Sequence, residues 1–197
     1  MNLPNKITMC RIFLSIALLV LLIFPFDLCG IDFPSYLVFG RINMNLKYII
    51  GGAIFLVASL TDSLDGYIAR SRNLVTDFGK VMDAIADKVL VNGVLIALAC
   101  DGTISVAIPV IIITRDIFVD SIKMVAGSKG KAVGASVLGK LKTICMMTGL
   151  TLTFFYNIPC ELINLDLANG LLYVATILSI ISGIQYYLVN KEAFKDK

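Results

Sequence analysis

The chain has 197 residues, of which 58% are apolar and only 16% are charged. A soluble domain carries about a quarter charged residues, so this composition favours an integral membrane protein. The sequence contains no histidine, which excludes catalytic triads that depend on imidazole. Its five cysteines form no C-x-x-C pair, so neither a zinc site nor a disulfide framework is predicted.

Six apolar stretches are long enough to cross a membrane as helices. They cover residues 8–26, 46–70, 76–100, 104–126, 134–157 and 167–189. No small-x-small cleavage site follows the first stretch, so we interpret it as a retained helix rather than a signal peptide. No internal repeat or long linker divides the chain. The sequence therefore predicts an all-α, polytopic membrane protein with six transmembrane helices in a single domain, residues 1–197.

The basic residues are distributed unevenly between the two sides that six spans would create. If both termini face the cytoplasm, fifteen of the 17 Lys and Arg residues fall on that side, and only Arg41 and Lys47 fall on the other. This is the positive-inside pattern of membrane proteins. It predicts a protein of the cell membrane with both termini and the basic face in the cytoplasm. A basic face also favours anionic lipids and substrates that carry phosphate.

Four aspartates lie in the second and third predicted spans. Asp62 and Asp65 are three residues apart, and Asp83 and Asp87 are four apart, so each pair shares one face of its helix. The short connection at residues 71–76 lets the two helices fold back, which brings the carboxylates together near the cytoplasmic boundary. Four carboxylates this close cannot all stay ionised unless cations neutralise them. Ligands that are all oxygen suit Mg²⁺ or Mn²⁺, so these four aspartates are predicted metal ligands.

Small and basic residues accompany the aspartates on the same helix faces. Gly66, Ala69 and Gly79 leave room for a large ligand to approach the helix backbone. Arg70 supplies a cation that can hold a phosphate with two bonds. An alternative is that the acids are only ion-paired with neighbouring Arg and Lys residues. A cation transporter would also use buried acids, but it does not account for the small residues, and no inverted repeat supports it.

The pattern as a whole resembles the signature of the CDP-alcohol phosphatidyltransferase family at every defined position. The matching residues are Asp62-x-x-Asp65-Gly66-x-x-Ala69-Arg70 and, after eight intervening residues, Gly79-x-x-x-Asp83-x-x-x-Asp87. The resemblance implies six transmembrane helices, a homodimer, two divalent ions and a CDP-activated lipid donor. It places the donor's CDP moiety on Asp62, Gly66, Ala69, Arg70 and Gly79. It also implies that an alcohol attacks the lipid phosphorus and that CMP leaves, with Asp87 as the base. Asp83 or a metal-bound water remains an alternative base, because metal ligation lowers the basicity of Asp87.

Three further segments bear on the acceptor alcohol. Residues 2–11, Arg115-Asp116 and residues 135–143 resemble bacterial members of the family that use glycerol 3-phosphate. In those members Glu often stands where this chain has Asp116, which leaves the role of Asp116 open. Glycerol 3-phosphate carries about two negative charges near neutral pH, so it needs a cationic pocket of its own. The candidate residues for its phosphate are Arg115, Lys131, Ser136, Lys140 and Lys142.

These features predict an enzyme of phospholipid biosynthesis. It transfers the phosphatidyl group of CDP-diacylglycerol to sn-glycerol 3-phosphate, which gives phosphatidylglycerol phosphate and CMP. Inositol phosphate, phosphatidylglycerol and serine remain alternative acceptors within the same family. The lysines of the acceptor set can instead be membrane anchors whose amines extend to the interface. Membrane lipids are the expected surroundings, and no nucleic-acid partner is expected.

Overall fold

In a computed structural model the described residues form six α-helices and one short β-hairpin. The backbone is described for residues 3–71, 76–128, 134 and 136–191, and the side chains of residues 3, 4, 63–71, 77 and 80 lie outside the description. The helices are α1 (Leu3–Ile23), α2 (Leu46–Ser71), α3 (Asp77–Cys100), α4 (Ala107–Ser128), α5 (Val137–Phe154) and α6 (Leu167–Asn190). The smaller elements are η1 (Phe26–Cys29), β1 (Ser35–Val38), β2 (Ile42–Asn45) and η2 (Cys160–Ile163).

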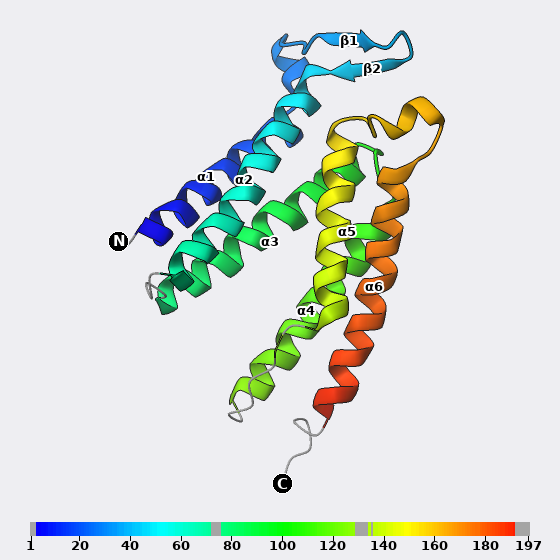
Figure 1. The fold of residues 1–197 in the computed structure, drawn as a ribbon. Helices are drawn as coiled ribbons and strands as arrows, with labels where there is room; N and C mark the ends of the chain where they lie inside the picture. Colours follow the sequence, from blue (N-terminus) through cyan, green and yellow to red (C-terminus); the bar gives the residue numbers. More distant parts are fainter. Residues whose placement is uncertain (1–2, 72–75, 129–133, 135, 192–197) are drawn as a thin grey trace.

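The helices run alternately in opposite directions, so their connections gather at two ends of the molecule (Figure 1). The connections 24–45, 101–106 and 155–166 lie at one end, which we call the hairpin end. The start of α1 and the ends of α2, α4 and α6 lie at the other, which we call the aspartate end. The prediction of a mostly helical membrane protein is confirmed, with helix bounds within a few residues of those expected.

The packed core lies in the half of the bundle nearer the hairpin end. Its buried residues come from all six helices and include Leu18, Phe55, Leu95, Ile108, Leu150 and Leu172. Each of these residues belongs to the half of its helix that faces the hairpin end. Because the shared core is confined there, the aspartate halves of the helices are free to border cavities.

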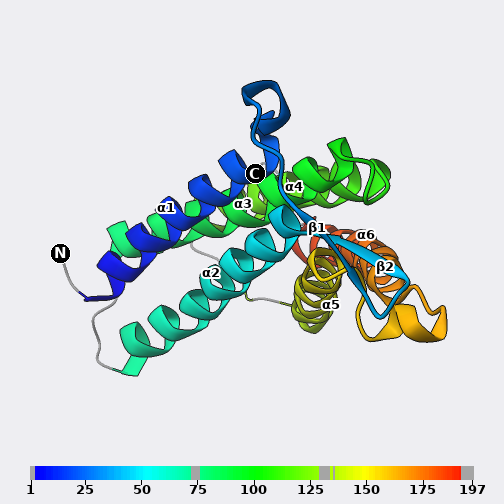
Figure 2. The same ribbon diagram turned by 90° about the horizontal axis from the view of Figure 1, so that it is seen from above.

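Helix α1 packs along both α2 and α3, whereas α2 and α3 have few contacts with each other. Figure 2 shows α1 running beside α3, with α2 diverging from both toward the aspartate end. The expectation that the two aspartate-bearing helices fold directly against each other is therefore only partly right. Their close neighbour is α1, which joins them.

The connection at residues 27–45 contains a hairpin that the sequence analysis did not predict. Strands β1 and β2 pair antiparallel, with Ser35 opposite Asn45 and Val38 opposite Ile42. Phe39 and Gly40 both adopt positive φ in the turn, a conformation that glycine tolerates far better than phenylalanine. The hairpin is tied to the bundle by the backbone N–H of Asn45, which donates to the hydroxyl of Tyr156 at 3.0 Å.

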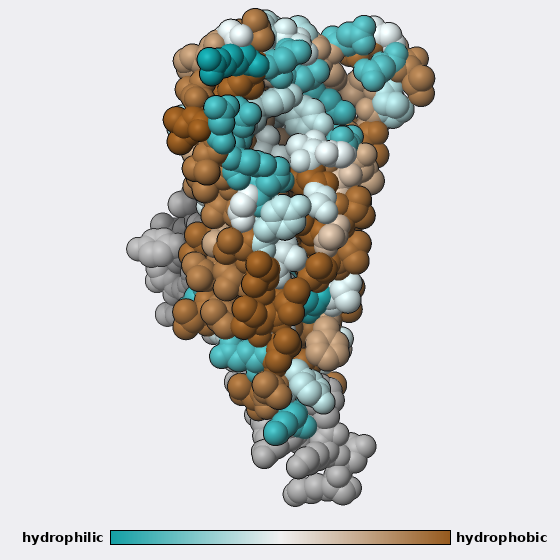
Figure 3. Space-filling view, turned by 90° about the vertical axis from the view of Figure 1, so that its right-hand side faces the viewer, coloured by the Kyte–Doolittle hydropathy of each residue, from teal (hydrophilic) through white to brown (hydrophobic). Residues whose placement is uncertain are grey.

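Among the described residues, three helical segments are long and apolar enough to cross a membrane: Asn5–Ile23, Val137–Phe154 and Leu167–Asn190. Exposed apolar side chains recur every three or four residues along α6, at Tyr173, Ile177, Ile180, Ile184 and Leu188. Figure 3 shows apolar residues over the middle of the face that includes α6, with hydrophilic residues gathered at the hairpin end. This distribution matches the hydrocarbon layer and its polar borders.

Candidate active site

Arg11 of α1 lies between two of the predicted aspartates. Its Nη1 donates to Asp62 Oδ1 of α2, and its Nη2 donates to Asp83 Oδ1 of α3. The arginine side chain is only 1% exposed, whereas the two aspartate side chains are 45% and 49% exposed. One guanidinium thus brings together carboxylates that are 21 positions apart in the sequence.

The remaining residues of the predicted metal and CDP sites are only partly described. Asp87 follows Asp83 by one helical turn on α3 and is exposed. Asp65, Gly66, Ala69 and Arg70 belong to α2, but their side chains lie outside the description. Within the described side chains, no group of three or more acidic or thiol residues surrounds a single point. Asp62 and Asp83 bring two carboxylates together at the Arg11 guanidinium. Carboxylate oxygens are donor atoms that fit Mg²⁺ or Mn²⁺.

Gly79 lies where α1 approaches the first turn of α3. A Cβ at this position would come within 2.7 Å of Asn5 Oδ1 and 3.0 Å of Thr76 Oγ1. Thr76 caps α3 by accepting from the backbone N–H of Gly79 at 3.0 Å, and Asn5 donates to the same hydroxyl at 3.3 Å. A side chain at this position would force Asn5 to move, so the close approach of α1 and α3 favours glycine here independently of any ligand. The assignment of Gly79 to CDP stays a prediction.

A cavity of about 270 Å³ opens between α3, α4, α5 and α6 at the aspartate end. It brings together Asp87 and the predicted acceptor residues Arg115, Lys140 and Lys142. The other lining residues include Lys88, Asn92, Asp116, Asp120, Lys123, Thr143 and Tyr186. The predicted base and three of the predicted acceptor cations thus face one space, although they come from three different helices.

Asp116 joins two of these cations. Lys142 Nζ donates to both carboxylate oxygens of Asp116, at 2.7 and 2.8 Å, and Arg115 Nη1 donates to Oδ1 at 2.9 Å. Arg115 is held further by α6, through bonds to Ser179 O at 3.1 Å and Ser182 Oγ at 2.7 Å. Asp116 therefore fixes the positions of both cations and neutralises part of their charge.

The other members of the predicted acceptor set differ in where they lie relative to the cavity. Lys140 lines the cavity and is exposed. Ser136 caps α5, where its Oγ accepts from the backbone N–H of Gly139 at 3.0 Å, and it is not among the described lining residues. Lys131 lies outside the described residues.

Sequence reasoning gave Arg11 no role in the site, since it counted this residue only in the basic face and in the segment 2–11, and it also missed the pairing role of Asp116. A signal for Arg11 was present, because Asn5, Thr8, Arg11 and Ser15 form a polar stripe at helical spacing in an apolar segment. Asp116, Asp120 and Lys123 similarly share one face of α4 and all line the cavity. Lys88 of α3 pairs with Asp120, so this wall of the cavity also carries an ion pair between helices.

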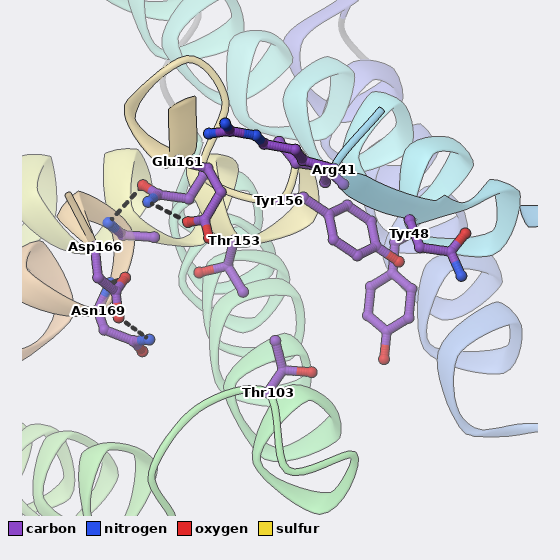
Figure 4. A pocket seen from close by; sticks show the side chains of 12 residues that line it. Arg41, Tyr48, Thr103, Thr153, Tyr156, Glu161, Asp166 and Asn169 are labelled. Atoms are coloured by element: carbon purple, nitrogen blue, oxygen red, sulfur yellow. Dashed lines mark hydrogen bonds between the residues drawn. The ribbon is translucent and has the colours of Figure 1, made fainter. Parts of the chain in front are cut away.

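A larger cavity, of about 520 Å³, lies at the hairpin end and contains none of the predicted site residues. Figure 4 shows its polar lining, including Arg41, Tyr48, Tyr156 and Glu161. Asn157 organises this region, since it donates to Leu165 O at 2.6 Å and Glu161 Oε2 at 3.2 Å and accepts from the N–H of Ala168. These bonds shape the connection between α5 and α6, whereas the predicted carboxylate and cations line the smaller cavity.

The chain is similar to known proteins over nearly its whole length. Residues 1–181 match the model of a family described as CDP-alcohol phosphatidyltransferase. A CDP-diacylglycerol–glycerol-3-phosphate 3-phosphatidyltransferase of Bacillus subtilis (strain 168) is 36% identical over 194 residues, which cover 98% of this chain and 97% of that protein. A protein of the same name from Rickettsia bellii (strain RML369-C) is 34% identical, with the same coverage of both chains.

Solved structures share the fold. The crystal structure of Mycobacterium tuberculosis phosphatidylinositol phosphate synthase with CDP-DAG bound has a TM-score of 0.65 and 20% identity, and covers 100% of this chain and 92% of that one. The same enzyme in complex with manganese and citrate has a TM-score of 0.61 and 19% identity, and covers 100% and 87% of the two chains. At this level of identity the likeness shows the fold alone.

Proposed function

Because the chain belongs to the CDP-alcohol phosphatidyltransferase family, whose model matches residues 1–181, we propose that it makes phosphatidylglycerol phosphate. It transfers the phosphatidyl group from CDP-diacylglycerol to sn-glycerol 3-phosphate and releases CMP. Relatives with this activity in their names match the chain nearly end to end. The observation that carries the choice of acceptor is the cavity that Asp87 shares with Arg115, Lys140 and Lys142.

All six helices cross the membrane in this proposal, and the aspartate end faces the cytoplasm. Helices α2, α3 and α4 carry more charge than the other three, but much of it faces the site or an ion partner, as with Asp62, Asp83 and Lys88. Internal polar residues of this kind are usual where a membrane protein binds a substrate. The chain acts as a homodimer, as the family resemblance implies.

The donor lies along α2 and α3. Asp62, Gly66, Ala69, Arg70 and Gly79 hold its CDP moiety, and Asp62, Asp65, Asp83 and Asp87 would hold two divalent ions, Mg²⁺ or Mn²⁺. When bound, these ions would neutralise the donor's diphosphate and stabilise the departing CMP. Arg11 supports the arrangement from α1, since it holds Asp62 and Asp83 at a common point.

The acceptor occupies the cavity between α3 and the last three helices. Arg115, Lys140 and Lys142 bind its phosphate. Asp116 holds Arg115 and Lys142 in position through ion pairs. The free primary hydroxyl then points toward Asp87, which takes its proton as the oxygen attacks the lipid phosphorus. Fixing both reactants in one geometry removes much of the entropic barrier to the displacement.

The direct test measures CMP release by purified protein with CDP-diacylglycerol, Mg²⁺ and a panel of acceptors. Turnover is expected with glycerol 3-phosphate and not with serine, inositol phosphate or phosphatidylglycerol. Turnover with another acceptor alone would leave the family assignment intact and reject the proposed acceptor.

Replacing Lys140 with glutamine is expected to weaken use of the acceptor without weakening donor binding. A charge-assisted bond to phosphate contributes roughly 1.5–3 kcal/mol, about one to two decades in an equilibrium constant. The KM for glycerol 3-phosphate should therefore rise by about that factor, measured by CMP release at saturating donor. Lys140 is the sharpest choice because it is exposed, whereas Arg115 and Lys142 also hold other residues.

Lys47→Gln is the matched control, since it removes the same charge near the hairpin end. It should leave the KM for glycerol 3-phosphate unchanged. If Lys140→Gln weakens CDP-diacylglycerol binding and leaves the acceptor KM intact, Lys140 belongs to the donor site or to membrane anchoring.

Cysteine labelling tests the proposed orientation. Cys29 is exposed in the connection between α1 and the hairpin, and Ser128 is exposed at the end of α4. In single-cysteine proteins, an impermeant maleimide added to intact cells should label Cys29. It should label Ser128→Cys only after the membrane is permeabilised. The opposite result would place the aspartate end outside the cell.

A further inference from the structure

One face of α1 is polar although the helix is apolar overall. Asn5, Thr8, Arg11 and Ser15 recur every three or four residues, and their exposed fractions are 9%, 4%, 1% and 0%. A polar face inside a membrane is costly unless the neighbouring helices supply partners. Here α2 and α3 supply the acceptors of Arg11, and Thr76, which caps α3, accepts from Asn5. Helix α1 is thus tied to the aspartate-bearing helices rather than being a simple anchor.

Arg11 is the charged member of this face, and its two terminal nitrogens are used on different helices. Nη1 donates to Asp62 of α2 and Nη2 donates to Asp83 of α3. Because α2 and α3 have few contacts of their own, this guanidinium is a principal link between the two carboxylates. Its planar fork suits two acceptors at once, which a lysine amine does not match.

The carboxylates that Arg11 engages belong to the set assigned to the divalent ions. A carboxylate oxygen that accepts from a guanidinium is a poorer metal ligand, and the two cations also repel each other. This opposition is reciprocal: the guanidinium weakens binding of the divalent ion to the carboxylates, and the divalent ion weakens their bonds to the guanidinium by the same factor. Asp62 and Asp83 are about half exposed, so a cation can reach them from the open side while Arg11 holds them from the buried side.

We propose that Arg11 is the internal counter-ion of the Asp62–Asp83 pair, and that it competes with the divalent ion for these carboxylates. It holds the two acids together against their repulsion, and it lowers the metal affinity of the site. Arg11 is thus a positioning residue rather than a catalytic one. The inference rests on the metal role given under the proposed function.

Metal affinity and thermal stability, rather than activity, provide the test. Wild-type protein, Arg11→Gln, Arg11→Lys and Lys6→Gln are purified in detergent, and Mn²⁺ binding is measured from the EPR signal of free Mn²⁺. Lys6 is the matched control, because it is an exposed cation on the same helix. The chain has no tryptophan, so unfolding is followed by circular dichroism, in EDTA and in Mn²⁺.

Arg11→Gln is expected to bind Mn²⁺ about tenfold more tightly than wild type, within the usual range of coupling between ligands. Its Tm in EDTA should fall below that of Lys6→Gln, and Mn²⁺ should raise its Tm more than it raises that of wild type. Arg11→Lys keeps the charge but loses the planar guanidinium, so its affinity for Mn²⁺ should lie between those of wild type and Arg11→Gln. This variant also keeps the test decisive if Arg11→Gln does not fold.

Weaker or unchanged Mn²⁺ binding in both Arg11 variants, with normal binding by wild type, overturns the competition and leaves Arg11 as a scaffold. An equal loss of Tm in EDTA and in Mn²⁺ does the same. Absence of Mn²⁺ binding by the wild-type protein instead rejects the metal role itself, and with it this inference. The two failures are therefore distinguishable.

Discussion

Asp83→Asn and Asp62→Asn are each expected to lower kcat by at least roughly a hundredfold. Loss of a residue that only hydrogen-bonds to a metal ligand already costs up to about a hundredfold in metal affinity or activity. The expected loss is larger for a ligand itself, because the metal ions that would neutralise the donor's diphosphate require the negative charge of the carboxylate. CMP release at saturating CDP-diacylglycerol and glycerol 3-phosphate measures it. Asparagine keeps an oxygen that can accept a hydrogen bond from Arg11, so the fold should persist.

Asp101→Asn is the control for these substitutions. Asp101 caps the opposite end of α3 and accepts from the Tyr48 hydroxyl at 2.9 Å, far from the proposed chemistry. It should retain turnover close to that of wild type. Normal turnover in Asp83→Asn, with its circular dichroism spectrum unchanged, would remove Asp83 from the active site.

Chelation of divalent ions is expected to abolish activity completely and reversibly. The proposed ligands are all carboxylate oxygens, a set suited to Mg²⁺ or Mn²⁺, and no histidine is available anywhere in the chain as an alternative ligand or base. CMP release should stop in excess EDTA and return when either ion is added beyond the chelator. Stopped activity that did not return would indicate an unfolded protein rather than an emptied site.

Ca²⁺ serves as the selectivity control for this experiment. It prefers more ligands and longer bonds, at 2.3–2.6 Å rather than about 2.0–2.1 Å for Mg²⁺. It is therefore expected to support turnover poorly. Full activity in excess EDTA, with the metal content of the sample checked, would reject the metal-dependent mechanism outright.

The lining of one cavity could be predicted in part from the sequence, whereas the lining of the other could not. The cavity at the aspartate end collects residues that were already singled out, namely Asp87, Arg115, Lys140 and Lys142. Their charge inside apolar segments made them conspicuous. The cavity at the hairpin end is lined by the hairpin, by connections and by the adjoining helix ends. Its polar residues are ordinary for such positions, so nothing in the sequence marked it.

The hairpin itself illustrates the limits of periodicity. Each strand has only four residues, too few for alternation to distinguish a strand from an irregular loop. Its pairing depends on a turn in which Phe39 adopts positive φ, and no preference of phenylalanine predicts that conformation. The bond from Asn45 to Tyr156 joins residues more than a hundred positions apart.

Composition and spacing by themselves determined that this chain is a helical membrane protein with a particular arrangement of aspartates. The reason is that the hydrocarbon layer admits a backbone only when its hydrogen bonds close within each helix, so long apolar runs define the helices locally. The helical period then fixes which aspartates share a face.

Only the tertiary structure decided which group meets those aspartates. The sequence analysis did not single out Arg11, and the polar stripe of α1 in which Arg11 lies does not indicate that it joins Asp62 to Asp83. Likewise, the sequence placed Asp116 beside Arg115, but not against Lys142 of another helix. A helix pattern gives the direction of a side chain around its own axis, whereas the partner depends on which helices pack side by side. That choice is made by the shared core near the hairpin end, where apolar residues of all six helices meet.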